Sequence, residues 1–289
     1  MTNDERNPND EIRKAKSPLS LFGLGISSLI RDSSFVIRHF LPALLFSAPV
    51  CLAQKEREQP PPLDPIVAER EARALVADLL AQKPEENSAK AGLLKIRDAK
   101  GEERELPVRV EILATATNWL SVYETLAAAG GLGPMKLTVV HTEHQPNQYL
   151  LVARGESGAN TEAKRVGAHE TMIPFAGSDF WLADLGLEFL HWPKQRLLAK
   201  EMRHSKSCDV LESTNPQPAP GGYARVVCWI TIEGPHGIVH ADAYDAANKL
   251  LKEFDPKKLE KVNGQYQLES MEMRTRKTGS RTILEFDTK

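Results

Sequence analysis

The stretch ELPVRVEILA, residues 105–114, alternates apolar side chains with largely polar ones. The apolar positions are Leu106, Val108, Val110 and Ile112. A period of two is that of a β-strand, in which successive side chains point to opposite faces. The stretch therefore predicts a strand with one face toward a core and the other toward water.

Nine further segments have strand-like patterns, and most are separated by short connections that carry Gly, Pro or Asn. They are NWLSVYETL, MKLTVVHTE, QYLLVAR, RLLAKEMR, CDVLES, YARVVCWITIE, GIVHADAYD, YQLESMEMRT and RTILEFD. Connections of hairpin length favour antiparallel pairing. We therefore predict a mainly β protein with a few helices (α+β), built on one large, curved antiparallel sheet.

Helical patterns occur at two other places. Asp64 is suited to cap a helix whose first residue is Pro65, and the amphipathic segment IVAEREARALVADLLAQK follows. Its expected apolar stripe consists of Ile66, Ala74, Leu75, Leu79 and Leu80. The segment FDPKKLEKV, residues 254–262, predicts a short helical turn.

The segment GSDFWLADLGLEFLHWP, residues 177–193, is the most aromatic part of the chain. Asp179 is the expected N-cap of a helix that Gly186 and Pro193 limit to two or three turns. The segment is too short and too charged to span a membrane. Two interpretations are open. It is a plug over the apolar face of the sheet, or it lines a gap beside the Leu106–Ile112 strand that takes an apolar ligand.

The first 53 residues have the pattern of a signal peptide with a long polar start. Arg38 and His39 precede an apolar run of signal-peptide length, and the small residues Cys51 and Ala53 favour cleavage before Gln54. A lipid anchor on Cys51 is less favoured, because the bulky Val50 precedes it. A second membrane segment in PLSLFGLGISSLI and a start site placed too far upstream are the alternatives for the region before it. Residues 54–63 form a proline-rich linker, and residues 64–289 are expected to form a single exported, soluble domain.

Charge and motifs argue against several classes of function. A net charge of −2 and a pI near 6.5 give no basic face for nucleic acid. His141 and His144 are three apart on a predicted strand and therefore face opposite sides. The series His236, His240, Asp242 and Tyr244 is spread along another strand. We therefore expect no metal site, no cofactor, no catalytic residue and no enzyme activity.

Two cysteines remain after the predicted cleavage, Cys208 and Cys228. They flank a Pro/Gly-rich turn centred near Pro218, so an antiparallel hairpin with that centre places them directly opposite each other. Cross-strand partners lie within the range that a disulfide bridges. A disulfide and a pair of buried thiols are both compatible with this arrangement.

Several of these segments together resemble the LolA-like group of outer-membrane lipoprotein-sorting proteins, in a divergent branch. The resemblance covers roughly Met172–Asp287 and rests on the aromatic segment with CDVLESTNP, YARVVCWITIE, AYDAANKLLKEFDPKKL and SMEMRTRKTGSRTILEFD. It implies a half-barrel whose concave face is covered by helices. The mature chain is longer than the typical carriers, and the lid-latching arginine of that group has no identified counterpart here.

The resemblance also implies a function. Such proteins work in the periplasm and shield the acyl chains of lipoproteins or lipids during transfer toward the outer membrane, with inner- and outer-membrane transport components as partners. A non-enzymatic periplasmic binding or scaffold module with a filled core is the alternative, and an envelope hydrolase is a third. Exposing acyl chains to water costs about 0.8 kcal/mol per CH₂. The candidate lining residues are Leu106, Val108, Val110, Ile112, Phe180, Trp181, Phe189, Val226 and Ile230.

Export makes a direct prediction about the mature N-terminus. Because small residues occupy positions 51 and 53, N-terminal sequencing of the protein from its own envelope should begin at Gln54 or within a few residues of it. An intact Met1, or an acylated Cys51 as the first residue, would contradict this.

Overall fold

The computed structural model describes residues 63–126, 134–153, 163–233, 236–262 and 265–287. The predicted signal peptide, its cleavage site and nearly all of the proline-rich linker lie outside these ranges. The first helix, α1 (Pro65–Leu80), begins where the sequence predicts. The Asp64 carboxylate caps it by accepting hydrogen bonds from the backbone nitrogens of Ile66 and Val67, at 2.9 and 3.2 Å.

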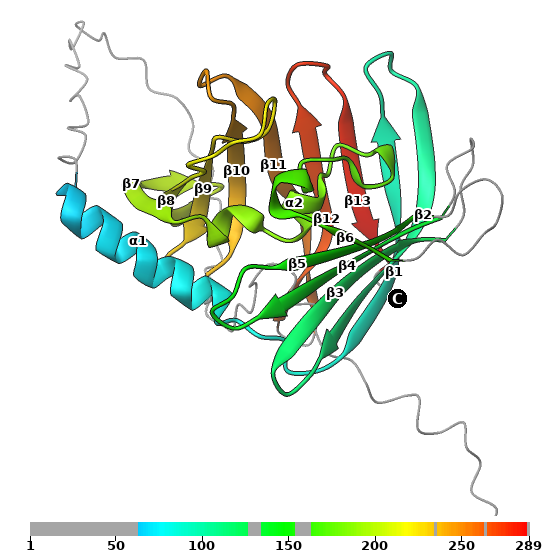
Figure 1. The fold of residues 1–289 in the computed structure, drawn as a ribbon, viewed down its shortest axis with the longest axis horizontal. Coiled ribbons are helices and arrows are strands. Elements are labelled where there is room, and N and C mark those ends of the chain that lie inside the picture. The colour runs from blue at the N-terminus through cyan, green and yellow to red at the C-terminus, as the bar shows by residue number, and fades with distance from the viewer. Residues whose placement is uncertain (1–62, 127–133, 154–162, 234–235, 263–264, 288–289) are drawn as a thin grey trace, which may run out of the picture.

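The described residues form one 13-stranded antiparallel sheet, which confirms the predicted fold class (Figure 1). All ten predicted strands are present, and β1, β6 and β11 are additional. The strands are β1 (Ser88–Arg97), β2 (Glu103–Ala114), β3 (Asn118–Thr125), β4 (Met135–Thr142), β5 (Gln148–Ala153), β6 (Lys164–Val166), β7 (Lys194–Arg203), β8 (Lys206–Thr214), β9 (Arg225–Thr231), β10 (Ile238–Tyr244), β11 (Leu250–Val262), β12 (Gln265–Thr275) and β13 (Arg281–Phe286).

The strand order is β6-β5-β4-β3-β2-β1-β13-β12-β11-β10-β9-β8-β7. Two meanders are thus joined at the centre by the pairing of β1 with β13. Gly92 lies at this junction opposite Phe286, and a Cβ at that position would be 2.3 Å from the carbonyl oxygen of Glu285. A glycine there permits the close approach of the two backbones. Figure 1 shows the two halves of the sheet curving toward each other, and we call the concave side that they enclose the hollow.

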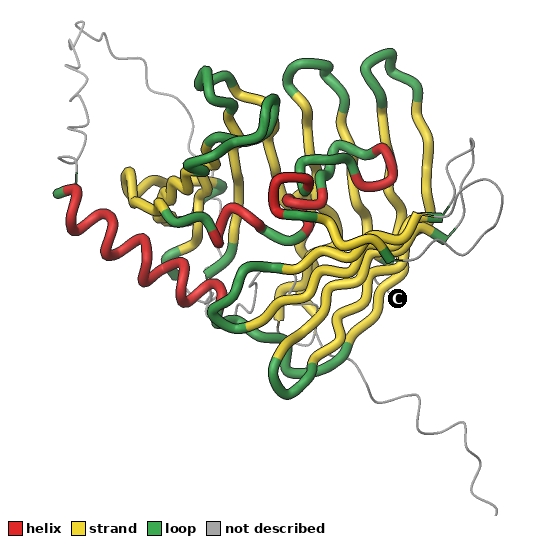
Figure 2. The backbone as a smooth tube through the Cα atoms, in the orientation of Figure 1, coloured by secondary structure: helices red, strands yellow, loops and turns green. Residues whose placement is uncertain are grey.

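Strands β6 and β7 are consecutive in sequence but lie at opposite edges of the sheet. The chain between them, residues 167–193, must therefore cross the hollow, and we call it the inner segment. Figure 2 shows it as short helical turns over the concave side of the sheet. The turns are η2 (Ala168–Glu170), η3 (Phe175–Gly177), α2 (Leu182–Leu185) and η4 (Glu188–His191).

The prediction of one helix of two or three turns in this segment is wrong. Leu187 has a left-handed backbone conformation, which separates α2 from η4. Asp179 caps no helix. Its carboxylate instead accepts hydrogen bonds from the hydroxyl groups of Thr275, Ser280 and Thr282, at 2.6, 2.6 and 2.8 Å, which tie the segment to β12, β13 and the turn between them.

Two smaller predictions also need correction. The buried face of α1 consists of Ala68, Ala72, Leu75 and Val76, whereas Ile66 is 77% exposed. The helix packs mainly against β7. Of the expected stripe, Leu75 is buried and Leu79 is partly buried, whereas Ala74 and Leu80 are exposed like Ile66. The segment FDPKKLEKV is not helical, because it lies within β11 and pairs with β12.

The expected cysteine pair does not form. Cys208 lies opposite Thr231, and Cys228 lies opposite Leu211, so the register differs from the expected one by three residues. An odd shift places the two side chains on opposite faces of the sheet. Both thiols are buried and free. Burial raises the pKa of each thiol, which keeps both in the protonated form.

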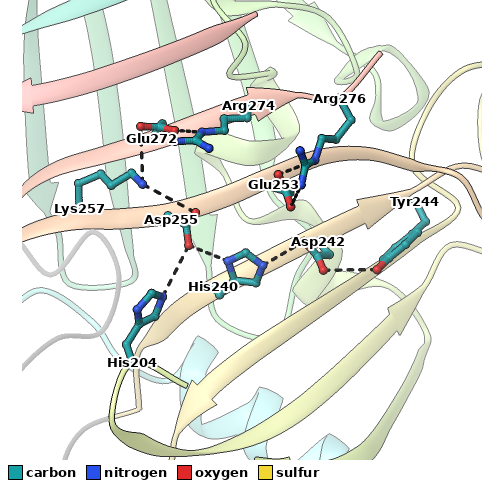
Figure 3. A network of polar contacts seen from close by, with 10 residues as sticks. All are labelled: His204, His240, Asp242, Tyr244, Glu253, Asp255, Lys257, Glu272, Arg274 and Arg276. Carbon is teal, nitrogen blue, oxygen red and sulfur yellow. Dashed lines mark hydrogen bonds and ion pairs between the residues drawn. The ribbon is translucent and has the colours of Figure 1, made fainter. Parts of the chain in front are cut away.

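The convex face of the C-terminal half carries a ladder of alternating charges, part of which Figure 3 shows. Its centre is His240, whose side chain is only 4% exposed. The imidazole Nδ1 is 2.7 Å from the Asp255 carboxylate and Nε2 is 3.0 Å from that of Asp242. These residues alternate with core residues such as Ala241 and Phe254, so they lie on the face opposite the apolar core.

The ladder crosses six strands, from β7 to β12. On one side, Asp242 accepts a hydrogen bond from Tyr244, whose ring lies 3.9 Å from the Arg225 guanidinium. On the other side, Lys257 bridges Asp255 and Glu272. The remaining members are Arg196, Glu212, His204, Glu253, Arg274 and Arg276. Opposite charges on neighbouring strands stabilise the outer face of the sheet.

The ladder predicts a pH-dependent stability. Burial lowers the pKa of His240, but its hydrogen bonds to Asp242 and Asp255 outweigh burial and leave the pKa above 6.5. The imidazolium form therefore stabilises the fold fully below the unfolded-state pKa, and this contribution declines as pH rises through the raised value. Urea unfolding at pH 5.5 and 8.5 should show a larger loss of stability at high pH for the wild type than for His240→Gln. An equal pH dependence of the two proteins would contradict this assignment.

Candidate functional site

The concave face of the sheet carries one continuous apolar cluster, to which all the candidate lining residues contribute. Leu106, Val108, Val110 and Ile112 enter it from β2, and Val226 and Ile230 enter it from β9. Phe180 and Phe189 reach it from the inner segment, and the partly buried Trp181 packs against it. The alternation read from the sequence therefore places these side chains on the correct face.

The space directly beneath the inner segment is nearly filled. A cavity of about 10 Å³ lies where the gap beside the Leu106–Ile112 strand was expected, lined by Val108, Val110, Phe180 and others. A second, of about 30 Å³, is lined in part by Phe180, Phe189 and Val226. Neither holds more than about one water molecule. At this position the inner segment acts as a core plug.

A much larger cavity lies beside the plug, between α1, the inner segment, strands β3 and β4, the loop after β4, and the start of β10. Its volume is about 460 Å³, within the range of roughly 300–1,000 Å³ typical of ligand pockets. In Figure 1, α1 runs across the open side of the half-barrel toward the β4–β5 turn. The apolar lining comes from α1 (Val76, Ala77, Leu79, Leu80), the inner segment (Leu185, Leu187, Leu190), β3 (Trp119) and β10 (Ile238).

Uncharged polar side chains form another wall of this cavity. The His141 ring stacks on Trp119, with ring centroids 3.6 Å apart, and its Nε2 lies 3.1 Å from the Ser121 hydroxyl. Burial lowers the pKa of His141 to about 3 and also lowers the pKa of His191, so both imidazoles are neutral at pH 7. Asn147 donates a hydrogen bond to the carbonyl oxygen of Gly186 at 2.6 Å.

The charged residues of the cavity lie at its rim. Lys83, just after α1, pairs with Glu143 at 2.6 Å, and both side chains are about half exposed. His144 is 90% exposed, so the cavity opens to solvent at this rim. Gln82 donates a hydrogen bond to the carbonyl oxygen of His236 at 3.3 Å. These contacts connect the C-terminal end of α1 to two loops of the sheet.

A buried lysine holds the inner segment in place. Lys252 of β11 is 2% exposed and points into the hollow. Its ammonium donates to the carbonyl oxygen of Asp179, lies 3.5 Å from the Asp184 carboxylate and sits 3.6 Å from the centroid of the Trp181 ring. Burial lowers its pKa to about 8 and raises the pKa of Asp184. Tyr223 completes the cluster by donating to Asp184 at 3.2 Å.

The sequence interpretation found some of these residues and missed others. His141 and His236 were considered as metal ligands, and the structure places them at the cavity wall instead. No group of three or more His, Cys, Asp or Glu side chains suited to a metal ion occurs in the part of the chain that the structure describes. Lys252 was not predicted. In the segment AANKLLKEF, residues 246–254, the only signal for an inward side chain is that Lys252 lies two residues before the apolar Phe254.

Solved structures show the same architecture. A DUF1329 family protein from Desulfovibrio piger has 18% identity and a TM-score of 0.62, over 78% of this chain and 92% of that one. An outer-membrane lipoprotein-sorting protein domain from Vibrio parahaemolyticus has 16% identity and a TM-score of 0.60, over 75% and 88%. A LolA superfamily protein from Nitrosomonas europaea has 15% identity and a TM-score of 0.52, over 76% and 91%. The chain therefore has a LolA-like half-barrel fold.

Comparison of sequences defines the family. A family model described as that of an uncharacterized protein matches residues 137–288, more than half of the chain. The chain belongs to this family. No curated protein sequence matches it. None of the helices within the described residues combines the length and the apolar character needed to cross a bilayer.

The Lys252 cluster makes a prediction about stability. Lys252→Met leaves the buried Asp184 carboxylate without its cation, and removal of one partner of a buried pair typically costs about 3–5 kcal/mol. Lys252→Met combined with Asp184→Asn should recover part of that loss, because the unpaired charge is gone. The exposed Lys249→Met, in the preceding turn, is the matched control and should change stability by less than about 0.5 kcal/mol. Urea unfolding measures all three, and an effect of Lys252→Met as small as the control would contradict the assignment.

Proposed function

We propose that this protein is a non-enzymatic carrier that shelters the acyl chain of a lipid or lipoprotein in the cavity between α1 and the inner segment. The observation that carries the proposal is this cavity, about 460 Å³ in volume, in which aliphatic side chains of α1 and the inner segment face a wall of polar side chains. A cavity of this size with one aliphatic side favours a ligand that has an apolar part. The likeness to LolA superfamily and lipoprotein-sorting structures supports the same class.

The site of binding in this proposal differs from the one inferred from sequence. The nine candidate residues form the packed floor of the hollow, and the ligand lies beside them, under α1. Phe180, Phe189 and Val226 border the small cavity next to it. Trp181 stacks on Tyr223, at a centroid distance of 4.6 Å, as part of the Lys252 cluster. In this proposal it supports the inner segment and does not contact the ligand.

The carrier would work in the periplasm after removal of the signal peptide, moving its ligand toward the outer membrane between transport components of the two membranes. Binding and release require no covalent chemistry. Burial of the ligand's acyl chain would contribute a binding free energy of about 0.8 kcal/mol per CH₂. Helix α1 is the wall suited to move, because it packs through four small or medium side chains and is tethered at its end by solvent-exposed contacts.

The alternative is a binding or scaffold module that works through protein contacts and has a filled core. The space beneath the inner segment is nearly filled, and this observation favours the scaffold module for that region of the protein. The two functions differ in whether the larger cavity admits hydrocarbon, and this can be measured directly.

Two tryptophan substitutions on α1 test the carrier function. Ala77 lines the cavity at its exposed edge, whereas Ala74 is exposed on the same helix and does not line it. The neutral probe N-phenyl-1-naphthylamine should bind the wild type at micromolar concentration, with a rise in fluorescence. Ala77→Trp should fill the cavity and weaken binding by at least about tenfold, while Ala74→Trp should bind like the wild type.

Melting temperatures of both variants control for unfolding, since each adds the same side chain to the same helix. Absence of probe binding in the wild type, or equal binding by the two variants, would favour the scaffold module.

A further inference from the structure

The polar wall of the large cavity consists of side chains that carry no charge. Apart from the rim, its side chains are neutral: His141, His191, Ser121, Asn147 and Trp119. Two cations border the cavity, and each has an acidic partner. Lys83 pairs with Glu143, and Arg73 lies 3.9 Å from Glu69 with its side chain 66% exposed. Among the described residues that line the cavity, no cationic side chain therefore lies inside it where it could pair with an anionic group of a ligand.

A carboxylate at this wall would lie in a buried environment without a counter-ion. Such burial is costly, and the usual response is that the group takes up a proton, which itself costs free energy at pH 7.5 because a carboxyl group in water is ionised there. A quaternary ammonium would meet no carboxylate at the wall either, since Glu143 is at the rim and already paired. Free fatty acids and cationic amphiphiles are thus both poorly matched to this end of the cavity.

One buried acceptor shows what the wall would favour. The side-chain amide of Asn147 donates to Gly186, which leaves its Oδ1 buried beside the His141 imidazole and without a hydrogen bond of good geometry. An unsatisfied buried acceptor has a free-energy cost that a ligand donor would remove. Carboxylates and simple esters offer only acceptors, whereas a hydroxyl or an amide N–H supplies the donor. The neutral imidazole of His191 provides one further donor and one acceptor, whereas the Nε2 of His141 is already paired with the Ser121 hydroxyl.

We propose that the carrier selects acyl compounds whose chain is joined by an ester or amide to an uncharged head that donates a hydrogen bond, and that Asn147 receives this bond. The acyl chain would lie against the aliphatic side chains of α1 and the inner segment, with the head toward Trp119 and His141. An acylglycerol provides such a head through its hydroxyl groups, and the acylated N-terminus of a lipoprotein provides it through its amide. This inference rests on the proposed carrier function and narrows its ligand class.

Displacement of N-phenyl-1-naphthylamine by ligands with one common chain tests the selectivity. Monolauroylglycerol represents the lipid source, N-lauroylglycinamide the lipoprotein source, and laurate and dodecyltrimethylammonium the charged heads. At pH 7.5, at least one uncharged ligand should bind about tenfold or more tightly than both charged ones. The tighter of the two uncharged ligands identifies the source.

Two variants locate the recognition. Asn147→Leu also removes the hydrogen bond to Gly186, so its effect is measured as a ratio of affinities. The affinity for the preferred uncharged ligand relative to that for laurate should fall by about tenfold, the equivalent of one hydrogen bond of about 1.4 kcal/mol. His141→Phe keeps a ring against Trp119 but removes the polar atoms that lie beside Asn147, so it should reduce the same preference.

The outcomes separate the two proposals. If the probe binds but laurate competes as well as the uncharged ligands, the selectivity is wrong and the carrier function stands. If both variants retain the full preference, the assignment to this wall is wrong. If the probe does not bind the wild type, the carrier function itself fails.

Discussion

The structure depends on how the inner segment satisfies its backbone while it crosses the hollow. The two edge strands that it joins, β6 and β7, are separated by the whole sheet, and buried carbonyl groups need hydrogen-bond donors. Side chains from the surrounding sheet supply them. Tyr123 donates to Leu185, Asn147 to Gly186, and Lys252 to Asp179. Arg104 reaches Ala176 and Gly177, and Gln195 reaches Phe189 and Trp192. Because these donors come from both halves of the sheet, the segment is fixed in place without being a regular helix.

This constraint divides the hollow into two parts with different properties. Under the inner segment, aromatic and aliphatic side chains fill the space, and the Lys252 and Asp179 clusters attach the segment to the C-terminal half of the sheet. Beside it, α1 covers the remaining opening with a shallow apolar face and leaves a cavity. In the proposed carrier, the tied segment maintains the shape of the half-barrel, and α1 is the element that would control access to the cavity. Apart from Asn147, which contributes to both, the proposal assigns binding and stability to different residues, and separate substitutions can test each.

Local patterns in the sequence predicted most of the fold and little of the site. The period of two placed Leu106 to Ile112 on the inner face, and Asp64 followed by Pro65 marked the start of α1, since both signals are local. The register between β8 and β9 was not predictable, because a ten-residue connection, Asn215–Ala224, does not fix it as a tight turn would. The inner segment has helical composition, but donors distant in sequence determine its path. Likewise, the cavity wall joins His141 of β4 to His191 of the inner segment, which only the tertiary fold brings together.

The central pairing of β1 with β13 has a consequence for how the chain reaches this structure. These strands lie at the two ends of the described sequence, so each half of the sheet keeps an exposed edge until the other is available. Contacts between such distant residues form slowly, and an unpaired edge can associate with other chains. A polypeptide that ends before Arg281 would leave β1 and β12 each unpaired on the side where β13 normally lies. Correct folding of this protein therefore requires that those two edges do not pair with other chains before β13 has been synthesised.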